Sequence, residues 1–418
     1  MFRKDVLDNG IRVVSESLPH VRSVSIGVWV NVGSRHEAPG QEGVSHFIEH
    51  MLFKGTKRRS AQDIAVEVDS IGGEMNAFTS REGTTYYLKV LDEHLPTAID
   101  ILSDVLLHST LAPKDVETER RVILEEIKML EDTPDDIIHD LLAQAVWPDN
   151  SLGHSILGTR ESIRRLERKA LLQYLEQYYH GRKMVISVAG RFDHDRLIHL
   201  LNQSFGSLAP DGSSFSPPTP TYCPGITIRR KELEQVQLCL AVRGLPQSHP
   251  DRYALSALNA VLGASMSSRL FQEIREKRGL VYNIYSYIAS FRDAGFLAVY
   301  AGTDRDNVRE VVRLVIEQML RLRDQGPTPL ELEKAREQMK GTLMLSLEST
   351  STRMTQLAKQ EIYFGRHFSL QNILDDIERV TVEQVERLSR ELITPESMAL
   401  TVLGPVSRKE LPENLFVA

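Results

Sequence analysis

Two histidines four residues apart, with a glutamate directly before the second, are the residues of this chain best suited to chemistry. They are His46, Glu49 and His50, in the stretch 43-GVSHFIEHMLFKGT-56. Positions i, i+3 and i+4 share one side of a helix, so both imidazoles and the carboxylate would project together. Two such imidazoles can bind one zinc ion, and the carboxylate beside them can take a proton from a metal-bound water. The order H-x-x-E-H is the inverse of H-E-x-x-H and is a recognised metallopeptidase motif.

The same stretch has the periodicity of an amphipathic helix. Its apolar residues stand at i, i+3, i+4, i+7 and i+8, which makes one buried face beside the histidine stripe. They are Val44, Phe47, Ile48, Met51 and Leu52. The motif alone leaves an alternative open, in which a core helix happens to carry two histidines on its solvated side.

A zinc site with one position open for water needs a third protein ligand. The predicted helix 115-DVETERRVILEEIKMLED-132 places Glu119, Val122, Ile123 and Glu126 on one stripe. Glutamates on an otherwise apolar stripe are costly to bury without a cation or a hydrogen-bond partner. Glu126 as a ligand and Glu119 as its support would explain them. The alternative is a helix edge with paired surface charges.

The chain reads as two halves with the same order of elements. A Pro-, Gly- and Ser-rich stretch at 209–222 predicts a linker between a domain at 1–208 and a related domain at 223–418. Each half begins with an alternating strand, at 24–33 and 236–244, and closes on another, at 184–190 and 398–404. The pattern predicts an α+β fold of two duplicated domains, each a mainly antiparallel sheet packed with helices.

The second half does not repeat the histidine motif. Aligning the two halves on their first strands puts Ser256, Asn259 and Ala260 at the positions of His46, Glu49 and His50. These residues cannot replace a set of two histidines and a glutamate. We therefore expect one zinc ion per chain, bound by the first half.

Composition narrows the class of protein. The 418 residues suit two domains, and the net charge of −7 without a basic run argues against nucleic acid as a partner. There is no apolar stretch long enough to span a membrane and no signal-peptide pattern, so a cytoplasmic protein is expected. Cys223 and Cys239 are too few for a disulfide framework and are predicted to be small buried thiols.

With these residues in place, the chain resembles the pitrilysin/insulinase family of zinc peptidases, and within it the bacterial relatives of the catalytic subunit of the mitochondrial processing peptidase. The segments HFIEHMLFKGT and ERRVILEEIKMLED carry the resemblance, which extends over the whole chain. It implies that His46, His50 and Glu126 bind zinc and that Glu49 is the general base. Glu119 matches the supporting glutamate of the family.

The resemblance also assigns roles in the second half. Within 262-LGASMSSRLFQEIREKRGLVYNIYS-286, Arg275 and Tyr282 match a pair that reaches the active site from the facing domain in family members. Their implied work is to hold the substrate backbone and stabilise the oxyanion. The alternatives are a surface helix charge and a half-buried strand residue. For a chain of this length, the resemblance implies a homodimer, or a heterodimer with a related subunit, in which this pair completes the partner's site.

Substrate contacts are implied along 74-EMNAFTSREGTTYY-87. The resemblance makes this segment the strand to which a peptide substrate adds, with contacts from Asn76, Ala77 and Phe78. Phe53, one turn beyond His50, would line the pocket after the scissile bond and favour an apolar residue there.

Acidic residues at 131-EDTPDDIIHDLL-142 are a second candidate contact. Asp136 and Asp140 stand at i and i+4, and in the processing peptidase acidic residues here bind a basic residue before the cut. The alternative is an acidic helix N-terminus with favourable dipole placement. Both interpretations remain open.

Two rival functions accompany the peptidase. Some family relatives keep the fold without the metal residues, so the chain could be a non-catalytic scaffold or a partner subunit of a processing-peptidase-like complex. It could also be a peptide-binding protein with slow hydrolysis. The complete set of metal residues favours the zinc endopeptidase.

Overall fold

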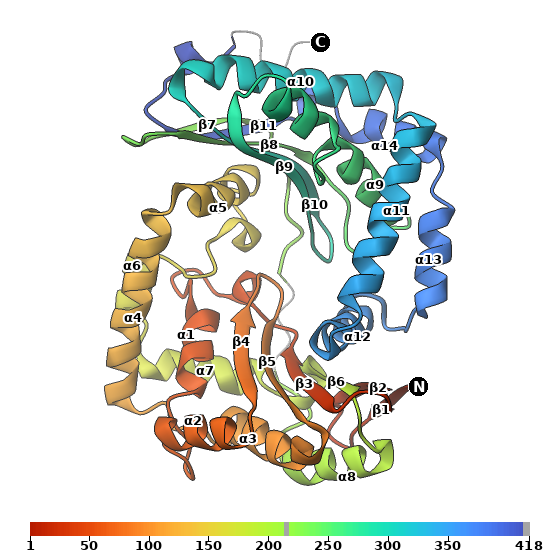
Figure 1. The fold of residues 1–418 in the computed structure, drawn as a ribbon. Helices are drawn as coiled ribbons and strands as arrows, with labels where there is room; N and C mark the ends of the chain where they lie inside the picture. The colour runs from red at the N-terminus through yellow and green to blue at the C-terminus, as the bar shows by residue number, and fades with distance from the viewer. Residues whose placement is uncertain (213–216, 413–418) are drawn as a thin grey trace. The chain divides into compact units, whose positions relative to one another are not determined.

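The computed structural model describes residues 1–212 and 217–412, which pack as two compact units (Figure 1). Unit 1 comprises Met1–Met129, His154–Pro217 and Ser346–His367. Unit 2 comprises Leu130–Gly153, Pro218–Leu345 and Phe368–Ala418. No helix in the described part of the chain is both long enough and apolar enough to cross a lipid bilayer.

Unit 1 is built on a mainly antiparallel sheet with the strand order β1-β2-β6-β3-β5-β4. Only β2 and β6 run parallel; the other neighbours are antiparallel. β4 lies at one edge of this sheet, where it pairs with β5 alone. The strands are β1 (Phe2–Val6), β2 (Arg12–Ser17), β3 (Ser23–Val30), β4 (Glu74–Thr79), β5 (Thr84–Leu91) and β6 (Met184–Gly190).

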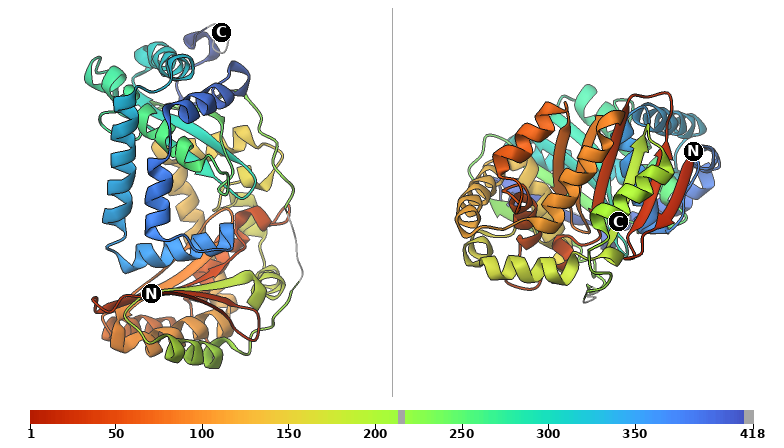
Figure 2. Two further views of the ribbon diagram at one scale, coloured as in Figure 1. Left: turned by 90° about the vertical axis from the view of Figure 1, so that its right-hand side faces the viewer. Right: turned by 90° about the horizontal axis from the view of Figure 1, so that it is seen from below.

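Helices cover both faces of this sheet. α3 and α8 pack on one face, on the side from which the right-hand view of Figure 2 is taken, and α12 packs on β2, β3 and β6. The helices of unit 1 are α1 (Val44–Leu52), α2 (Ala61–Ser70), α3 (Leu95–His108), α4 (Pro113–Glu131, whose last two residues belong to unit 2), α6 (Arg160–Arg165), α7 (Arg168–Tyr178), α8 (His194–Phe205) and α12 (Thr350–Phe364).

Unit 2 repeats this strand arrangement without a counterpart of β1. Its order is β7-β11-β8-β10-β9, again with one parallel pair, β7 with β11, and antiparallel neighbours elsewhere. The predicted fold of two duplicated α+β domains is therefore confirmed. The strands are β7 (Gly225–Arg230), β8 (Val236–Arg243), β9 (Val281–Ser290), β10 (Gly295–Thr303) and β11 (Ala399–Gly404).

The helices of unit 2 also lie on two faces. α5 packs on β8 and β11, whereas α9 packs with α10 and α14 in the core of buried aliphatic residues. These helices are α5 (Pro134–Val146), α9 (Arg252–Leu262), α10 (Val308–Gln325), α11 (Pro329–Ser346, whose last residue belongs to unit 1), α13 (Leu370–Glu378) and α14 (Val382–Leu392). A short π-helix, η5 (Phe271–Glu276), precedes β9.

Two helices pack in the unit that is formed mainly by the other half of the sequence. α5 comes from the first half but belongs to unit 2, and α12 comes from the second half but belongs to unit 1. The division at 209–222 follows the repeat in the sequence and remains a prediction about domains. Packing shows where α12 is held: Ser187 Oγ donates to the carbonyl of Met354 at 2.6 Å. A Cβ on Gly27 would lie 2.9 Å from Met354 Sδ, so this close approach suits glycine.

The two cysteines differ from each other. Cys239 is fully buried, as predicted, but Cys223 is only half-buried. It lies between the predicted linker and β7, where its backbone N–H donates to the carbonyl of Val146 while the side chain stays partly open to solvent. Both are free thiols.

Candidate metal centre

α1 is anchored by its apolar face, as its sequence predicts. Val44, Phe47, Ile48, Met51 and Leu52 are all fully buried in the core of unit 1. Burying side chains of this size contributes about 1.5–3 kcal/mol each before the entropy cost of ordering them. The neighbouring stripe of the helix is therefore fixed in direction and carries His46, Glu49 and His50 outward from the core.

A buried carboxylate that the sequence did not point to holds the start of α1. Glu37 accepts the backbone N–H of Gly43 at 2.8 Å and that of Ser45 at 2.9 Å. Gly43 has a φ of 90°, a left-handed conformation that favours glycine. Burial raises the pKa of Glu37 to about 8, against the two backbone donors that favour its charged form. Glu37 thus satisfies two of the N–H groups that begin the helix.

α4 presents its glutamates to α1. Glu119, Ile123 and Ile127 are buried, and Glu126 is half-buried. The spacing predicts Val122 on the same stripe, but Val122 is 41% exposed. The buried side of α4 is centred toward Ile123 and Ile127, so Val122 lies beyond its edge.

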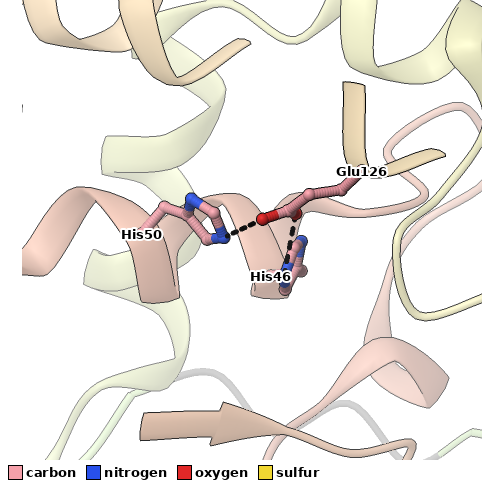
Figure 3. A group of neighbouring side chains, drawn as sticks. All are labelled: His46, His50 and Glu126. Carbon is pink, nitrogen blue, oxygen red and sulfur yellow. Dashed lines mark ion pairs between the residues drawn. The ribbon is translucent and has the colours of Figure 1, made fainter. Parts of the chain in front are cut away.

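The structure brings His46, His50 and Glu126 together (Figure 3). One candidate ligand atom from each lies within 4.8 Å of the others. Glu126 Oε1 is 3.6 Å from His50 Nε2, and Glu126 Oε2 is 3.8 Å from His46 Nε2. Both distances are too long for a hydrogen bond. They are near the separation of about 3.4 Å between two ligands of one tetrahedral zinc ion.

The electrostatics of the trio also fit a cation. Among the described residues, the buried Glu126 Oε2 has no hydrogen-bond partner, so this oxygen is available to a cation. Burial lowers the pKa of His46 to about 3, with a smaller contribution from the charge of His50. His46 is therefore neutral over the ordinary pH range, which is the form that binds a metal. The donor set of two imidazoles and one carboxylate suits zinc.

Glu119 orients one of the two histidines. Its Oε2 lies 3.0 Å from His50 Nδ1, and its side chain is only 4% exposed. A carboxylate can only accept, so Nδ1 carries the proton and Nε2 is left free toward Glu126. Such a partner fixes both the tautomer and the ring direction of a ligating histidine.

Glu49 points to the end of β4. Its Oε2 accepts a hydrogen bond from Thr79 Oγ1, the last residue of that strand. Burial raises the pKa of Glu49, and the hydrogen bond from Thr79 lowers it by less. Thr79 belongs to the stretch predicted as the substrate strand, but nothing in its sequence context marked it as a partner of Glu49.

The predicted substrate strand is a sheet edge. In β4, Asn76 and Phe78 are exposed, whereas Ala77 is half-buried against the core of unit 1. Phe78 packs edge-on against Trp29 and Tyr87. The half-buried Phe53, at the end of α1, lies 6.1 Å from Tyr86 between ring centroids.

Arg275 and Tyr282 lie together in unit 2. The guanidinium of Arg275 is 5.6 Å from the ring centroid of Tyr282 and 4.7 Å from that of Phe271, within the range of cation–π contacts. Tyr282 is 80% exposed. Arg275 lies on the π-helical turn η5. π-Helical turns of this kind occur often at functional sites.

Asp136 and Asp140 lie on α5, also in unit 2. Asp136 is exposed in the first turn, and Asp140 is half-buried. Between them, His139 makes contacts of 2.7 Å with Tyr287 Oη and 3.1 Å with Tyr285 Oη. Burial lowers the pKa of His139, against the opposing effect of the aspartates. His139 thus packs within unit 2, against two tyrosines of β9.

Comparison with known proteins places these residues in a family. A sequence profile described as insulinase (peptidase family M16) matches residues 12–160, which include all residues of the candidate metal centre. A second profile, described as the peptidase M16 inactive domain, matches residues 165–339. The second match covers Ser256, Asn259 and Ala260 on α9, which stand in place of the metal motif.

Relatives match over nearly their full length. An uncharacterised zinc protease of Bacillus subtilis is 46% identical over 97% of this chain and 98% of its own. One of Mycobacterium leprae is 40% identical over 99% of this chain and 94% of its own.

Two solved structures share the fold. A peptidase M16 inactive domain from Pseudomonas fluorescens superposes with a TM-score of 0.91 at 20% identity, over 97% of this chain and 98% of that one. A protease from Helicobacter pylori gives 0.89 at 22% identity, over 97% and 99%. The sequence matches and the shared fold agree with the resemblance drawn from the motifs, and the chain belongs to the insulinase family of peptidases, M16.

Proposed function

We propose that this chain is a zinc-dependent endopeptidase that hydrolyses peptides or unfolded segments bound as an added strand along β4. The convergence of His46, His50 and Glu126 beside Glu49 is the observation that carries the proposal. The relatives named as zinc proteases support the choice of metal. Zinc held by the trio would supply a Lewis acid that lowers the pKa of a water and polarises the scissile carbonyl.

The chain's own residues do the rest of the chemistry. Glu49 takes a proton from the attacking water and later delivers it to the leaving amine. Thr79 holds the Glu49 carboxylate at the end of β4, so the base and the substrate strand are connected by one hydrogen bond. A peptide added to β4 gains main-chain hydrogen bonds, which give affinity with little sequence demand. Phe53 lines the pocket after the scissile bond and favours an apolar side chain.

A digest of a peptide library tests this function. Zinc-loaded protein is expected to cut unfolded peptides internally, with an apolar residue enriched after the cut. The same protein stripped of metal by a chelator should be inactive and should recover when zinc is returned. Cleavage that persists in metal-free protein, or peptide binding without any cleavage in the zinc-loaded form, would contradict the proposal. The second result would favour the peptide-binding alternative.

We further propose a dimer whose two sites are shared between subunits. Arg275 and Tyr282 of one subunit would hold the substrate backbone and stabilise the oxyanion at the metal centre of the other. Asp136 and Asp140 would bind a basic residue before the cut. Support comes from the single metal motif in the sequence and from the contact between Arg275 and the exposed Tyr282.

Mixing two inactive variants tests the sharing of sites. Glu49→Gln and Arg275→Ala subunits should each be inactive alone but regain activity together. In an equal mixture that exchanges freely, half of the dimers are mixed and each has one intact site, so about a quarter of the wild-type rate is expected. Light scattering and differently tagged subunits establish that mixed dimers formed. No recovery in confirmed mixed dimers means that each chain completes its own site.

A further inference from the structure

We propose that Lys54 is a positioning residue for the metal centre, acting on His50 through Glu119. This inference rests on the proposed zinc site and adds to it a residue that does not touch the ion. Lys54 Nζ lies 2.8 Å from Glu119 Oε1, while Glu119 Oε2 lies 3.0 Å from His50 Nδ1. One carboxylate therefore bridges the ammonium and the imidazole, with a separate oxygen for each.

The position of Lys54 in the sequence makes this bridge possible. α1 ends at Leu52, and the backbone N–H of Lys54 still donates to the carbonyl of Met51 at 3.1 Å. Lys54 therefore follows His50 by one turn and lies on the same side of the helix end. A cation is also favoured at a helix C-terminus, so the end of α1 stabilises the ammonium of Lys54 in addition to its ion pair with Glu119.

Glu119 needs this partner because it is buried. Its side chain is 4% exposed, whereas that of Lys54 is 36% exposed. A buried carboxylate with one unsatisfied oxygen is costly, and its side chain can relieve that cost by rotating toward another donor. That rotation would weaken its hold on the Nδ1–H of His50. With Lys54 in place, each oxygen of Glu119 has its own partner, and His50 Nε2 stays free to face Glu126.

A purely electrostatic role for Lys54 predicts the opposite change in zinc affinity, so the two roles can be distinguished by experiment. Glu49, Glu119 and Glu126 bring three formal negative charges, and Lys54 brings one positive charge. If Lys54 acted only as a nearby charge, its removal would make the site more negative and strengthen the binding of a cation. If it acts through Glu119, its removal weakens binding, because lost support of a ligating histidine typically costs about 10–100-fold in metal affinity.

Zinc affinity measured by competition with a chelator is the test. Lys54→Met is expected to weaken zinc binding about tenfold, and Lys54→Arg to retain most of the affinity because it keeps the ion pair. Lys57→Met is the matched control: it removes an exposed positive charge from the same loop and should leave the affinity within about twofold. Thermal unfolding of the metal-free forms checks that each variant is folded.

Two further measurements separate positioning from a general loss of structure. In a Glu119→Gln background, Lys54→Met should cause no further weakening, because the two residues act in one chain of contacts. In metal-free protein with ¹⁵N-labelled histidine, the wild type should show His50 protonated on Nδ1, and Lys54→Met should shift it toward a mixture of tautomers.

The possible failures are distinct. Wild-type protein that takes up no zinc would overturn the proposed function itself. Wild-type protein that binds zinc while Lys54→Met binds it equally well or more tightly overturns only the role of Lys54. Additive effects of Lys54→Met and Glu119→Gln would also overturn it, since they would place Lys54 outside the contact with His50.

Discussion

Glu49→Gln is expected to lower the rate of peptide hydrolysis by about 10²–10⁴-fold while zinc stays bound. The amide is nearly the same size as the carboxylate but cannot take a proton from water. Glu49 is not one of the three residues whose ligand atoms converge, so its replacement leaves the trio in place. Thr79 Oγ can still donate to the amide oxygen, so the local hydrogen bond survives the change.

Kinetics with a fluorogenic peptide and zinc analysis of the same sample measure this effect. Glu125→Gln is a suitable control because it makes the same chemical change at an exposed position on α4. The control should keep wild-type activity. The role of Glu49 as base is wrong if Glu49→Gln hydrolyses peptide at the wild-type rate. If it also loses zinc, the loss of activity has another cause.

Glu126→Gln is expected to weaken zinc binding by more than about a hundredfold and to abolish hydrolysis. Removing a residue that only supports a ligating histidine typically lowers metal affinity about 10–100-fold, so the loss of a direct ligand should exceed that range. An amide oxygen is a weaker ligand than a carboxylate and brings no charge to balance the ion. The adjacent Glu125→Gln again serves as the control, one residue away on the exposed side of the same helix.

Chelator competition on the two variants gives the comparison. Glu126→Gln that binds zinc as tightly as Glu125→Gln would remove Glu126 from the ligand set. Excess zinc should partly restore hydrolysis by Glu126→Gln but not by Glu49→Gln, because only the former lacks a ligand. This difference separates the loss of metal from the loss of the base.

Much of the candidate metal centre could be predicted because three of its residues lie within one short helix. The positions of His46, Glu49 and His50 on one side of a helix follow from helix geometry, and the fully buried face beside them follows from periodicity. Glu126 could be proposed because a glutamate on an apolar helix stripe is costly to bury without a cation or a hydrogen-bond partner. Its approach to both histidines depends on how α4 packs on α1, which the sequence does not specify.

Contacts between distant segments could not be predicted. Glu37 and Thr79 are ordinary polar residues in their own segments and gain their roles only from Gly43, Ser45 and Glu49. Lys54 likewise belongs to a motif that was noticed for its histidines. A sequence pattern reports which side of an element is apolar, but it does not report which polar groups will meet across the fold.

For the same reason, the sequence did not predict that α5 packs in unit 2 and α12 in unit 1. Periodicity gives α5 and α12 an apolar face each, but both sheets offer an apolar surface to receive it. Because the two sheets share one strand order, either helix suits either sheet by pattern alone. The choice is made by contacts such as those of Met354 with Gly27 and Ser187, which a single sequence does not reveal.

The most direct test of the metal centre is a zinc-edge anomalous difference map from crystals of zinc-loaded protein. Glu49→Gln is the form to use, because it should keep the metal without digesting itself or its substrate. The expected result is one peak per chain, about 2.0–2.2 Å from His46 Nε2, His50 Nε2 and a carboxylate oxygen of Glu126. A map without a peak at these three residues, from protein shown to contain zinc, would contradict the site proposed here.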